Sequence, residues 1–401
     1  MASERSEAHQ RALHAGIETW GSCWNVILAS RAPGRLELLG NHIDYNGGPV
    51  LAAAINRDVV CLLGASELPG ISVVFPDIGS ELHHLDIETL HEWRNPAGAL
   101  VPLDYVRGVM ATTLARGGKV RDTVTLSIAG DVPIGFGLSS SAALCIALTQ
   151  ALCTSPPTGR DLVLWAQEAE HRAGTPCGTM DQSASVGGEV ILFDGSTVTW
   201  KSISPDLDGH VFAVANSGIS RSLATSSYAK RVDESRIGLD AANQLLGTGH
   251  ANLAELSNEE LEVVLANDGV DQVIKKRIRH IVTETFRVRE GIDAVAKGNW
   301  DEFGKLMTLS GKSSAFDYEI SHPSVEELVS IVSGVRGVLG ARMMGGGEGG
   351  TALILLHERA EAELRGSLHS AYFRSREMNS SSALQVLQFA AGASLENGQH
   401  A

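Results

Sequence analysis

Short apolar runs and longer alanine- and leucine-rich segments alternate along the first half of the chain. Residues 25–30, 50–55 and 59–63 are largely apolar, and residues 123–128 alternate between apolar and polar side chains. These patterns predict strands. The segment 31–48 contains prolines and glycines and is predicted to be a turn between two of them. Helices are predicted over residues 102–117, 142–153 and 162–173.

The second half mixes strands with a long helical region. Residues 188–193 and 198–200 predict a hairpin, and residues 210–215 and 351–356 predict two further strands. Residues 226–310 are mostly helical in pattern, and the tail from residue 396 is expected to be loose. The mixture predicts an α+β protein with two lobes. We place a first lobe at residues 1–200 and a second at residues 201–401.

Composition narrows the class of protein. The chain has 401 residues, of which 43% are hydrophobic and 20% charged, as in a globular protein. Its net charge of −15 disfavours nucleic acid and anionic lipid as partners. Apolar runs are too short to predict a membrane span, and the polar start lacks a signal peptide's apolar segment. Five scattered cysteines indicate reduced thiols, so we expect a cytoplasmic protein.

A glycine-punctuated loop at residues 130–143 carries the strongest chemical signal. It joins a predicted strand to a predicted helix, where unpaired N–H groups and the helix dipole favour phosphate oxygens. Its glycines allow close approach of a ligand, and three serines add hydroxyl groups. It is not a Walker A sequence. The structural alternative is a glycine turn with a serine cap on an ordinary helix.

Three segments in one order extend this signal: residues 32–35 with 40–45, residues 137–143, and residues 345–350. Residues 169–171, 176–182, 216–223 and 317–321 add matches. Over roughly residues 23–392 the sequence resembles the GHMP kinases, most closely their galactokinase branch. The resemblance implies a ribosomal-protein-S5-like N-terminal lobe and a ferredoxin-like C-terminal lobe, with the active site in the cleft between them.

The resemblance also implies a reaction. Galactokinases transfer the γ-phosphate of ATP to the anomeric hydroxyl of a free sugar. Asp181 would face that hydroxyl as a base or orienting group, and Arg35 would keep it ionised. The structural alternatives are a helix or turn cap for Asp181 and a surface ion pair for Arg35.

The nucleotide and its metal ion would occupy the glycine loop. By resemblance, Glu170 and Ser141 would hold Mg²⁺, for which two protein oxygens suffice. Glu170 could instead lie on a solvated helix face. The implied phosphate-binding residues are Gly135, Gly137, Leu138, Ser139, Ser140, Ser141 and Ala142.

The sugar site implied by the resemblance contains Asn41, His42, Asp44, Gly178 and Tyr228. Galactose is the leading substrate. Galactokinases carry glutamate where this chain has Asn41, at the residue that contacts the C6 hydroxyl. The lost charge makes galacturonate, arabinose or N-acetylgalactosamine alternative substrates. His42 and Asp44 could alternatively bind a metal, but no third ligand lies near them in the sequence.

Two more departures and two other functions stay open at this point. The family's threonine is lost at Ile43, and Glu348 stands where an aromatic or small residue is usual. That carboxylate could point away from the triphosphate or help to hold Mg²⁺. A non-catalytic sugar sensor and a kinase for mevalonate or homoserine are the other functions considered. The expected partners are a sugar and ATP, and the expected state is a monomer or weak homodimer.

Overall fold

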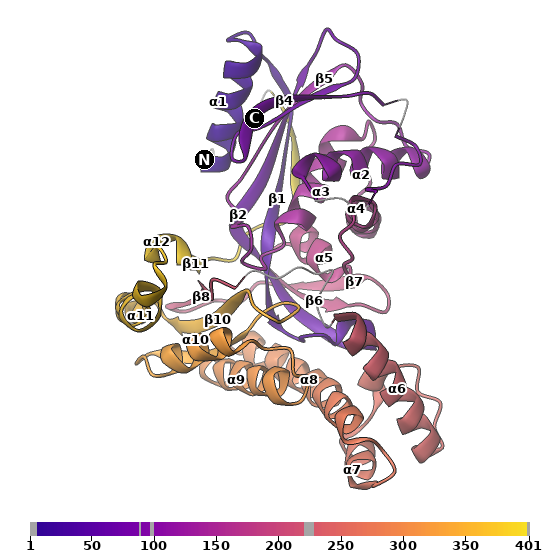
Figure 1. Ribbon diagram of the computed structural model, residues 1–401, viewed down its shortest axis with the longest axis vertical. Coiled ribbons are helices and arrows are strands. Elements are labelled where there is room, and N and C mark those ends of the chain that lie inside the picture. Colours follow the sequence, from indigo (N-terminus) through magenta and orange to yellow (C-terminus); the bar gives the residue numbers. More distant parts are fainter. Residues whose placement is uncertain (1–5, 88–89, 97–99, 220–227, 399–401) are drawn as a thin grey trace.

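The computed structural model describes residues 6–87, 90–96, 100–219 and 228–398. Its strands form an eight-stranded sheet and a four-stranded sheet, which occupy two lobes (Figure 1). One hydrophobic core cluster includes residues of both sheets, so the two lobes share buried surface. This arrangement confirms the predicted α+β class.

The larger sheet contains long strands that reach from the first lobe toward the second (Figure 1). Its main order is β12-β1-β2-β5-β3-β4, and β6 and β7 continue it beside part of β2. All pairs are antiparallel except β3 with β5. The strands are β1 (Val26–Leu39), β2 (Pro49–Ala65), β3 (Ile71–Phe75), β4 (Gly79–Leu85), β5 (Val124–Gly130), β6 (Val190–Asp194), β7 (Thr199–Ile203) and β12 (Ser394–Asn397).

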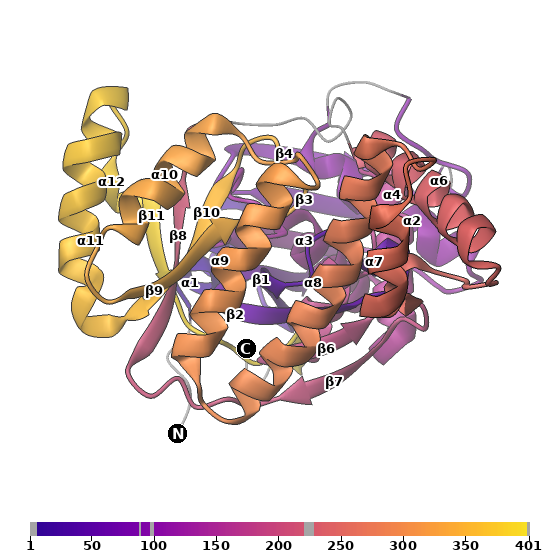
Figure 2. The same ribbon diagram turned by 90° about the horizontal axis from the view of Figure 1, so that it is seen from below.

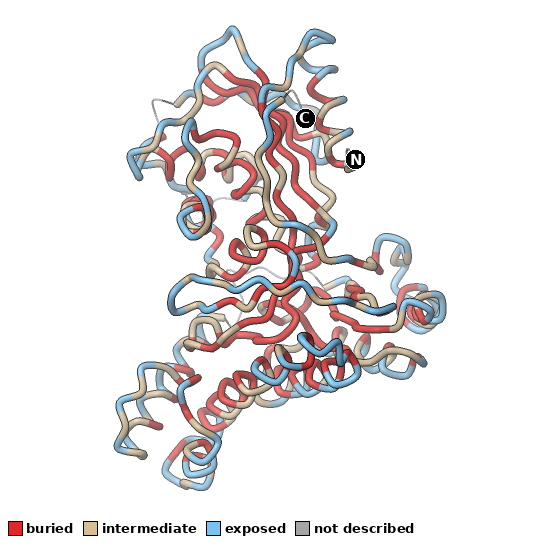
Figure 3. The backbone as a smooth tube through the Cα atoms, turned by 180° about the vertical axis from the view of Figure 1, so that it is seen from behind, coloured by how far each residue is buried: buried red, intermediate tan, exposed pale blue. Residues whose placement is uncertain are grey.

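Helices cover both faces of this sheet. The helices α3 (Ser140–Leu152) and α5 (Met180–Gly187) pack on β1 and β2, with α2 (Pro102–Ala115) and α4 (Gly159–Ala173) beside them. On the opposite face, α1 (Glu7–Trp20) packs Ala8 and Ala12 against the sheet in a second, smaller cluster. Figure 3 shows buried residues running through the sheet between these layers.

The smaller sheet has the ferredoxin-like order β11-β8-β10-β9, with antiparallel neighbours. In this order β8, which comes first of the four in the chain, lies between β11, which comes last, and β10, which comes third, as in a split βαβ arrangement. Helices α9 and α10 pack on β9, and α8 packs beside α9 (Figure 2). The strands are β8 (His210–Asn216), β9 (Val338–Met343), β10 (Thr351–His357) and β11 (Leu384–Leu387). The helices are α6 (Tyr228–Leu246), α7 (Asn258–Ala266), α8 (Gln272–Ala296), α9 (Trp300–Phe316), α10 (Pro323–Ser333), α11 (Glu361–Leu368) and α12 (Ser380–Ala383).

The predicted turn at residues 31–48 is wrong over its first half. β1 continues through Pro33 and Gly34 to Leu39. A register shift between Pro33 and Arg35 absorbs the proline, because two residues of β1 there span four residues of β2. A Cβ on Gly34 would lie 2.6 Å from the Leu138 carbonyl oxygen, so glycine allows the strand to touch the glycine loop.

The C-terminal tail is also more ordered than predicted. Residues 394–397 form β12, which pairs with Leu28 to Arg31 of β1 and covers that sheet edge. The predicted lobe boundary at residue 200 falls inside β7, and it stays a prediction.

Candidate active site

Arg35 and Asp181 meet between the larger sheet and the glycine loop. Arg35 Nε donates to Asp181 Oδ1 at 2.8 Å, and Nη2 lies 2.7 Å from the same oxygen. Ser139 Oγ donates to Asp181 Oδ2 at 2.6 Å. The arginine side chain is 6% exposed and the aspartate side chain 28%. The carboxylate is therefore fixed by three donors yet remains open to a ligand.

The glycine loop between β5 and α3 is tied to both lobes. Arg35 donates through Nη1 to the Gly137 carbonyl at 2.5 Å, and its amide donates to the carbonyl of the buried Leu138. From the second lobe, Thr351 Oγ1 donates to the Phe136 carbonyl at 3.0 Å. These bonds hold the loop beside the Arg35–Asp181 pair.

The backbone of the loop turns sharply before the helix. Gly135, Gly137 and Ser139 have φ of 83°, 67° and 61°, a conformation that glycine adopts easily and serine rarely. The chain then enters α3 at Ser140, so the first helical turn includes Ser141 and Ala142. The expected phosphate-binding residues therefore lie at the start of a helix, where free N–H groups favour an anion.

An apolar cavity lies beside this loop. It has a volume of about 370 Å³ and reaches Ser140, Ser141 and Leu144 of α3. Its other lining residues include Phe75, Ile78, Leu100, Val101, Tyr105, Ile128, Val132 and Ile134. An apolar pocket next to a helix N-terminus suits a ligand with a flat ring at one end and phosphates at the other.

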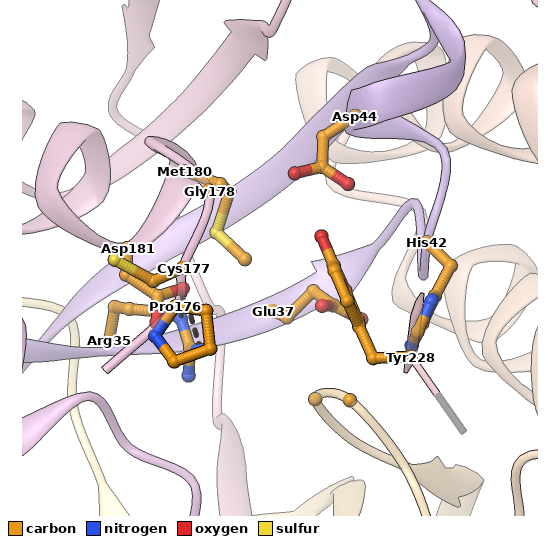
Figure 4. Close-up of a pocket in the computed structure, with 12 residues that line it drawn as sticks. Arg35, Glu37, His42, Asp44, Pro176, Cys177, Gly178, Met180, Asp181 and Tyr228 are labelled. Carbon is orange, nitrogen blue, oxygen red and sulfur yellow. Dashed lines mark hydrogen bonds and ion pairs between the residues drawn. The ribbon is translucent and has the colours of Figure 1, made fainter. Parts of the chain in front are cut away.

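A second, more polar cavity includes Asp181 in its lining (Figure 4). Both lobes line it. The first contributes residues from β1, from the segment after it, and from the segment that leads into α5 together with the start of α5; the second contributes Tyr228, Gly345 and Gly346. The lining residues are Arg35, Glu37, His42, Asp44, Pro176, Cys177, Gly178, Met180, Asp181, Tyr228, Gly345 and Gly346.

Four of the five sugar-site residues expected from the sequence line this cavity. His42 Nδ1 lies 2.9 Å from the Tyr45 hydroxyl, and the His42 ring centroid lies 5.3 Å from that of Tyr228. Desolvation, followed by the charge of Glu37, raises the pKa of Asp44 to about 6. A Cβ on Gly178 would lie 2.9 Å from Asp44 Oδ2, so glycine leaves room for that carboxylate.

The fifth residue, Asn41, does not line the cavity. It is fully buried, and its Nδ2 donates to Glu37 Oε1 and to the Gly345 carbonyl, each at 2.8 Å. Its Oδ1 accepts from Ser314 at 3.1 Å. The cavity lining therefore gives no support to the expected contact between Asn41 and a sugar, and Glu37 is the carboxylate that lies beside Asn41 in this lining.

The expected metal ligand Glu170 lies on α4 and is 1% exposed, so it does not occupy a solvated helix face. Its hydrogen-bonding partners include the Ser141 hydroxyl and the Gln182 side-chain amide, neither of which carries a positive charge. Desolvation raises the pKa of Glu170 to about 7. A buried carboxylate with neutral partners, next to the first turn of α3, fits a cation bound together with phosphates.

Glu348 lies in the glycine-rich turn between β9 and β10. Its φ is 59°, and its N–H donates to the Ile320 carbonyl at 2.6 Å. It lines neither of the two cavities described above.

Within residues 6–87, 90–96, 100–219 and 228–398, no group of three or more histidine, cysteine or acidic side chains is placed to hold a metal ion. No helix in this described part is long and apolar enough to cross a membrane.

Glu37 is the charged cavity residue that the sequence reasoning missed. The signal was a single carboxylate among leucines, in the run Leu36-Glu37-Leu38-Leu39. A charged residue in a buried apolar run needs a partner, and such a residue is a candidate for function. The predicted turn at this place hid the signal, because a glutamate in an exposed turn needs no explanation.

Comparison with known proteins agrees with this geometry. A family model described as the galactokinase galactose-binding signature matches residues 25–65, which include Arg35, Glu37 and Asp44. Models of the N-terminal and C-terminal GHMP kinase domains match residues 104–189 and 292–374.

Whole-chain relatives give the same assignment. A galactokinase of Thermotoga petrophila is 31% identical over 352 residues, which cover 85% of this chain and 93% of the relative. The crystal structure of Lactococcus lactis galactokinase complexed with galactose has a TM-score of 0.84 at 27% identity, covering 96% of this chain and 99% of that chain. Methanococcus jannaschii mevalonate kinase, at 17% identity and a TM-score of 0.62 over 91% and 98% of the two chains, shares the fold. This chain is a sugar kinase that belongs to the GHMP kinases and, within them, to the galactokinase family.

Proposed function

We propose that this enzyme transfers the γ-phosphate of ATP to the anomeric hydroxyl of galactose. The position of Asp181 carries the proposal: its carboxylate lies between the polar cavity and the glycine loop, held by Arg35 and Ser139. Curated galactokinases and the galactose-bound Lactococcus lactis enzyme support galactose as the substrate.

In the proposed reaction, Asp181 accepts the proton of the anomeric hydroxyl. The hydroxyl oxygen forms a bond to the γ-phosphorus, while the bond from that phosphorus to the β,γ-bridging oxygen breaks and ADP leaves with the electron pair. Arg35 orients Asp181 and places a positive charge beside the transferred group. The amides from Gly135 to Ala142 bind the phosphates of ATP, and the apolar cavity receives its adenine ring.

We propose Ser141 and Glu170 as the residues that hold Mg²⁺. When bound, the ion would neutralise charge on the phosphates. Ionised Glu170 would then have a positive partner, which its hydrogen-bonding partners among the described residues do not supply. The expected cytoplasmic location and the expected monomer or weak homodimer stay predictions.

The test measures ADP release by the purified protein with ATP, Mg²⁺ and a panel of free sugars. We expect turnover with galactose and formation of galactose 1-phosphate. The panel includes galacturonate, arabinose and N-acetylgalactosamine. No turnover with galactose would refute the proposal, and calorimetric galactose binding without ADP release would favour a sensor.

A further inference from the structure

Glu37 places a carboxylate in the polar cavity, at a position for which the sequence reasoning gave no role. It follows Arg35 by two residues on β1, and the register with β2 is regular from Arg35 to Glu37. Alternate residues of a strand face the same side, so both side chains reach the cavity. Figure 4 shows Glu37 between Arg35 and Tyr228 in that view.

Two donors hold one oxygen of this carboxylate. Arg342 Nη2 and Asn41 Nδ2 each lie 2.8 Å from Oε1. Arg342 comes from β9, is fully buried, and also donates to the carbonyls of Leu38 and Met343. The charge of Glu37 is therefore paired, as a buried charge must be. Within the described part of the chain both donors reach Oε1, so Oε2 is the oxygen available to a ligand in the cavity.

The spacing along β1 suits a monosaccharide. Two strand residues span about 7 Å, which is comparable with the length of a pyranose. With the anomeric hydroxyl at Asp181, the opposite end of the ring, which carries the C4 and C6 substituents, extends along the strand toward Glu37.

The charge of the cavity also bears on the substrate. Its lining holds the carboxylates of Glu37, Asp44 and Asp181, while Arg35 is already paired with Asp181. The replacement at Asn41 therefore does not leave this region without a negative charge. A sugar with a carboxylate at C6 would meet like charge there.

We propose that Glu37 binds the sugar by accepting a hydrogen bond from a C4 or C6 hydroxyl, and that its charge excludes hexuronic acids. This inference rests on the proposed function. It assigns to position 37 a contact that the sequence comparison alone assigned to position 41.

The experiment compares kcat/KM for galactose, 4-deoxygalactose, 6-deoxygalactose and galacturonate in the wild type, Glu37→Gln and Glu37→Ala. Ratios between sugars in one preparation do not depend on the fraction of folded enzyme, so a poorly folding variant remains informative. A hydrogen bond to a charged group predicts a wild-type preference for galactose over one deoxy sugar of roughly 10- to 100-fold. We expect Glu37→Ala to reduce that preference at least tenfold, and Glu37→Gln to reduce the preference for galactose over galacturonate.

Glu234→Gln is the matched control. Glu234 is another buried carboxylate held by arginines, with Arg231 Nη1 at 2.7 Å and Arg277 Nε at 2.6 Å, but it does not line the cavity. Its substitution should leave every sugar ratio unchanged. Unchanged ratios in both Glu37 variants, or a wild type that uses galacturonate as well as galactose, would overturn this inference. A wild type inactive on galactose would instead refute the proposed function.

Discussion

Asp181→Asn separates the chemical role of the carboxylate from its structural role. Asparagine keeps an acceptor for Arg35 at Oδ1, and the Ser139 hydroxyl can rotate to accept from the new amide. The local geometry should therefore survive, while the group that we propose as the proton acceptor is lost. General base catalysis contributes about 10²–10⁴ in rate, which corresponds to about 2.7–5.4 kcal/mol of activation free energy.

The assay is steady-state ADP release with galactose as substrate, combined with calorimetric titration of an ATP analogue. We expect kcat to fall by that factor and the dissociation constant of the nucleotide to change less than about threefold, because the loop amides are untouched. Ser139→Ala is the control, since it removes one donor and keeps the carboxylate. An Asp181→Asn variant retaining more than a tenth of wild-type kcat would show that the carboxylate is not the base.

Single contacts give three further predictions. The raised pKa of Asp44, about 6 against an ordinary 3.8, means that the fold favours the protonated carboxyl. Relative to Asp44→Asn, the wild type should lose on the order of 3 kcal/mol of unfolding free energy as pH rises from about 4 through 6, measured by urea denaturation. A difference in unfolding free energy between the two proteins that does not change with pH would contradict this. Gly178→Ala should raise KM for galactose about tenfold, because its Cβ would displace Asp44, whereas Gly366→Ala, in open space, should not. Thr351→Val should leave the Phe136 carbonyl unpaired, which should lower the free energy of unfolding, measured by urea denaturation, by about 1–3 kcal/mol and weaken ATP binding. Thr351→Ser keeps the hydroxyl and should restore both the stability and the ATP affinity.

Local sequence was sufficient to predict the strand, glycine loop and helix that we propose as the phosphate-binding element. The alternating run before residue 130, the glycines after it and the alanine-rich helix are adjacent in the chain, and β5, the loop and α3 follow in that order. The positive φ of Gly135 and Gly137 depends on the residue type itself. The family resemblance, rather than periodicity, was needed to connect Arg35 with Asp181 across the chain.

Tertiary structure decided that the Glu37 carboxylate, rather than the Asn41 amide, lines the polar cavity. Pairing with β2 extends β1 through the predicted turn, and this brings Arg35 and Glu37 to one face. Arg342 and the Gly345 carbonyl, some three hundred residues away, then fix Glu37 and turn Asn41 away from the cavity. The sequence shows the chemical type of each side chain, but the orientation of that side chain depends on partners that only folding brings beside it.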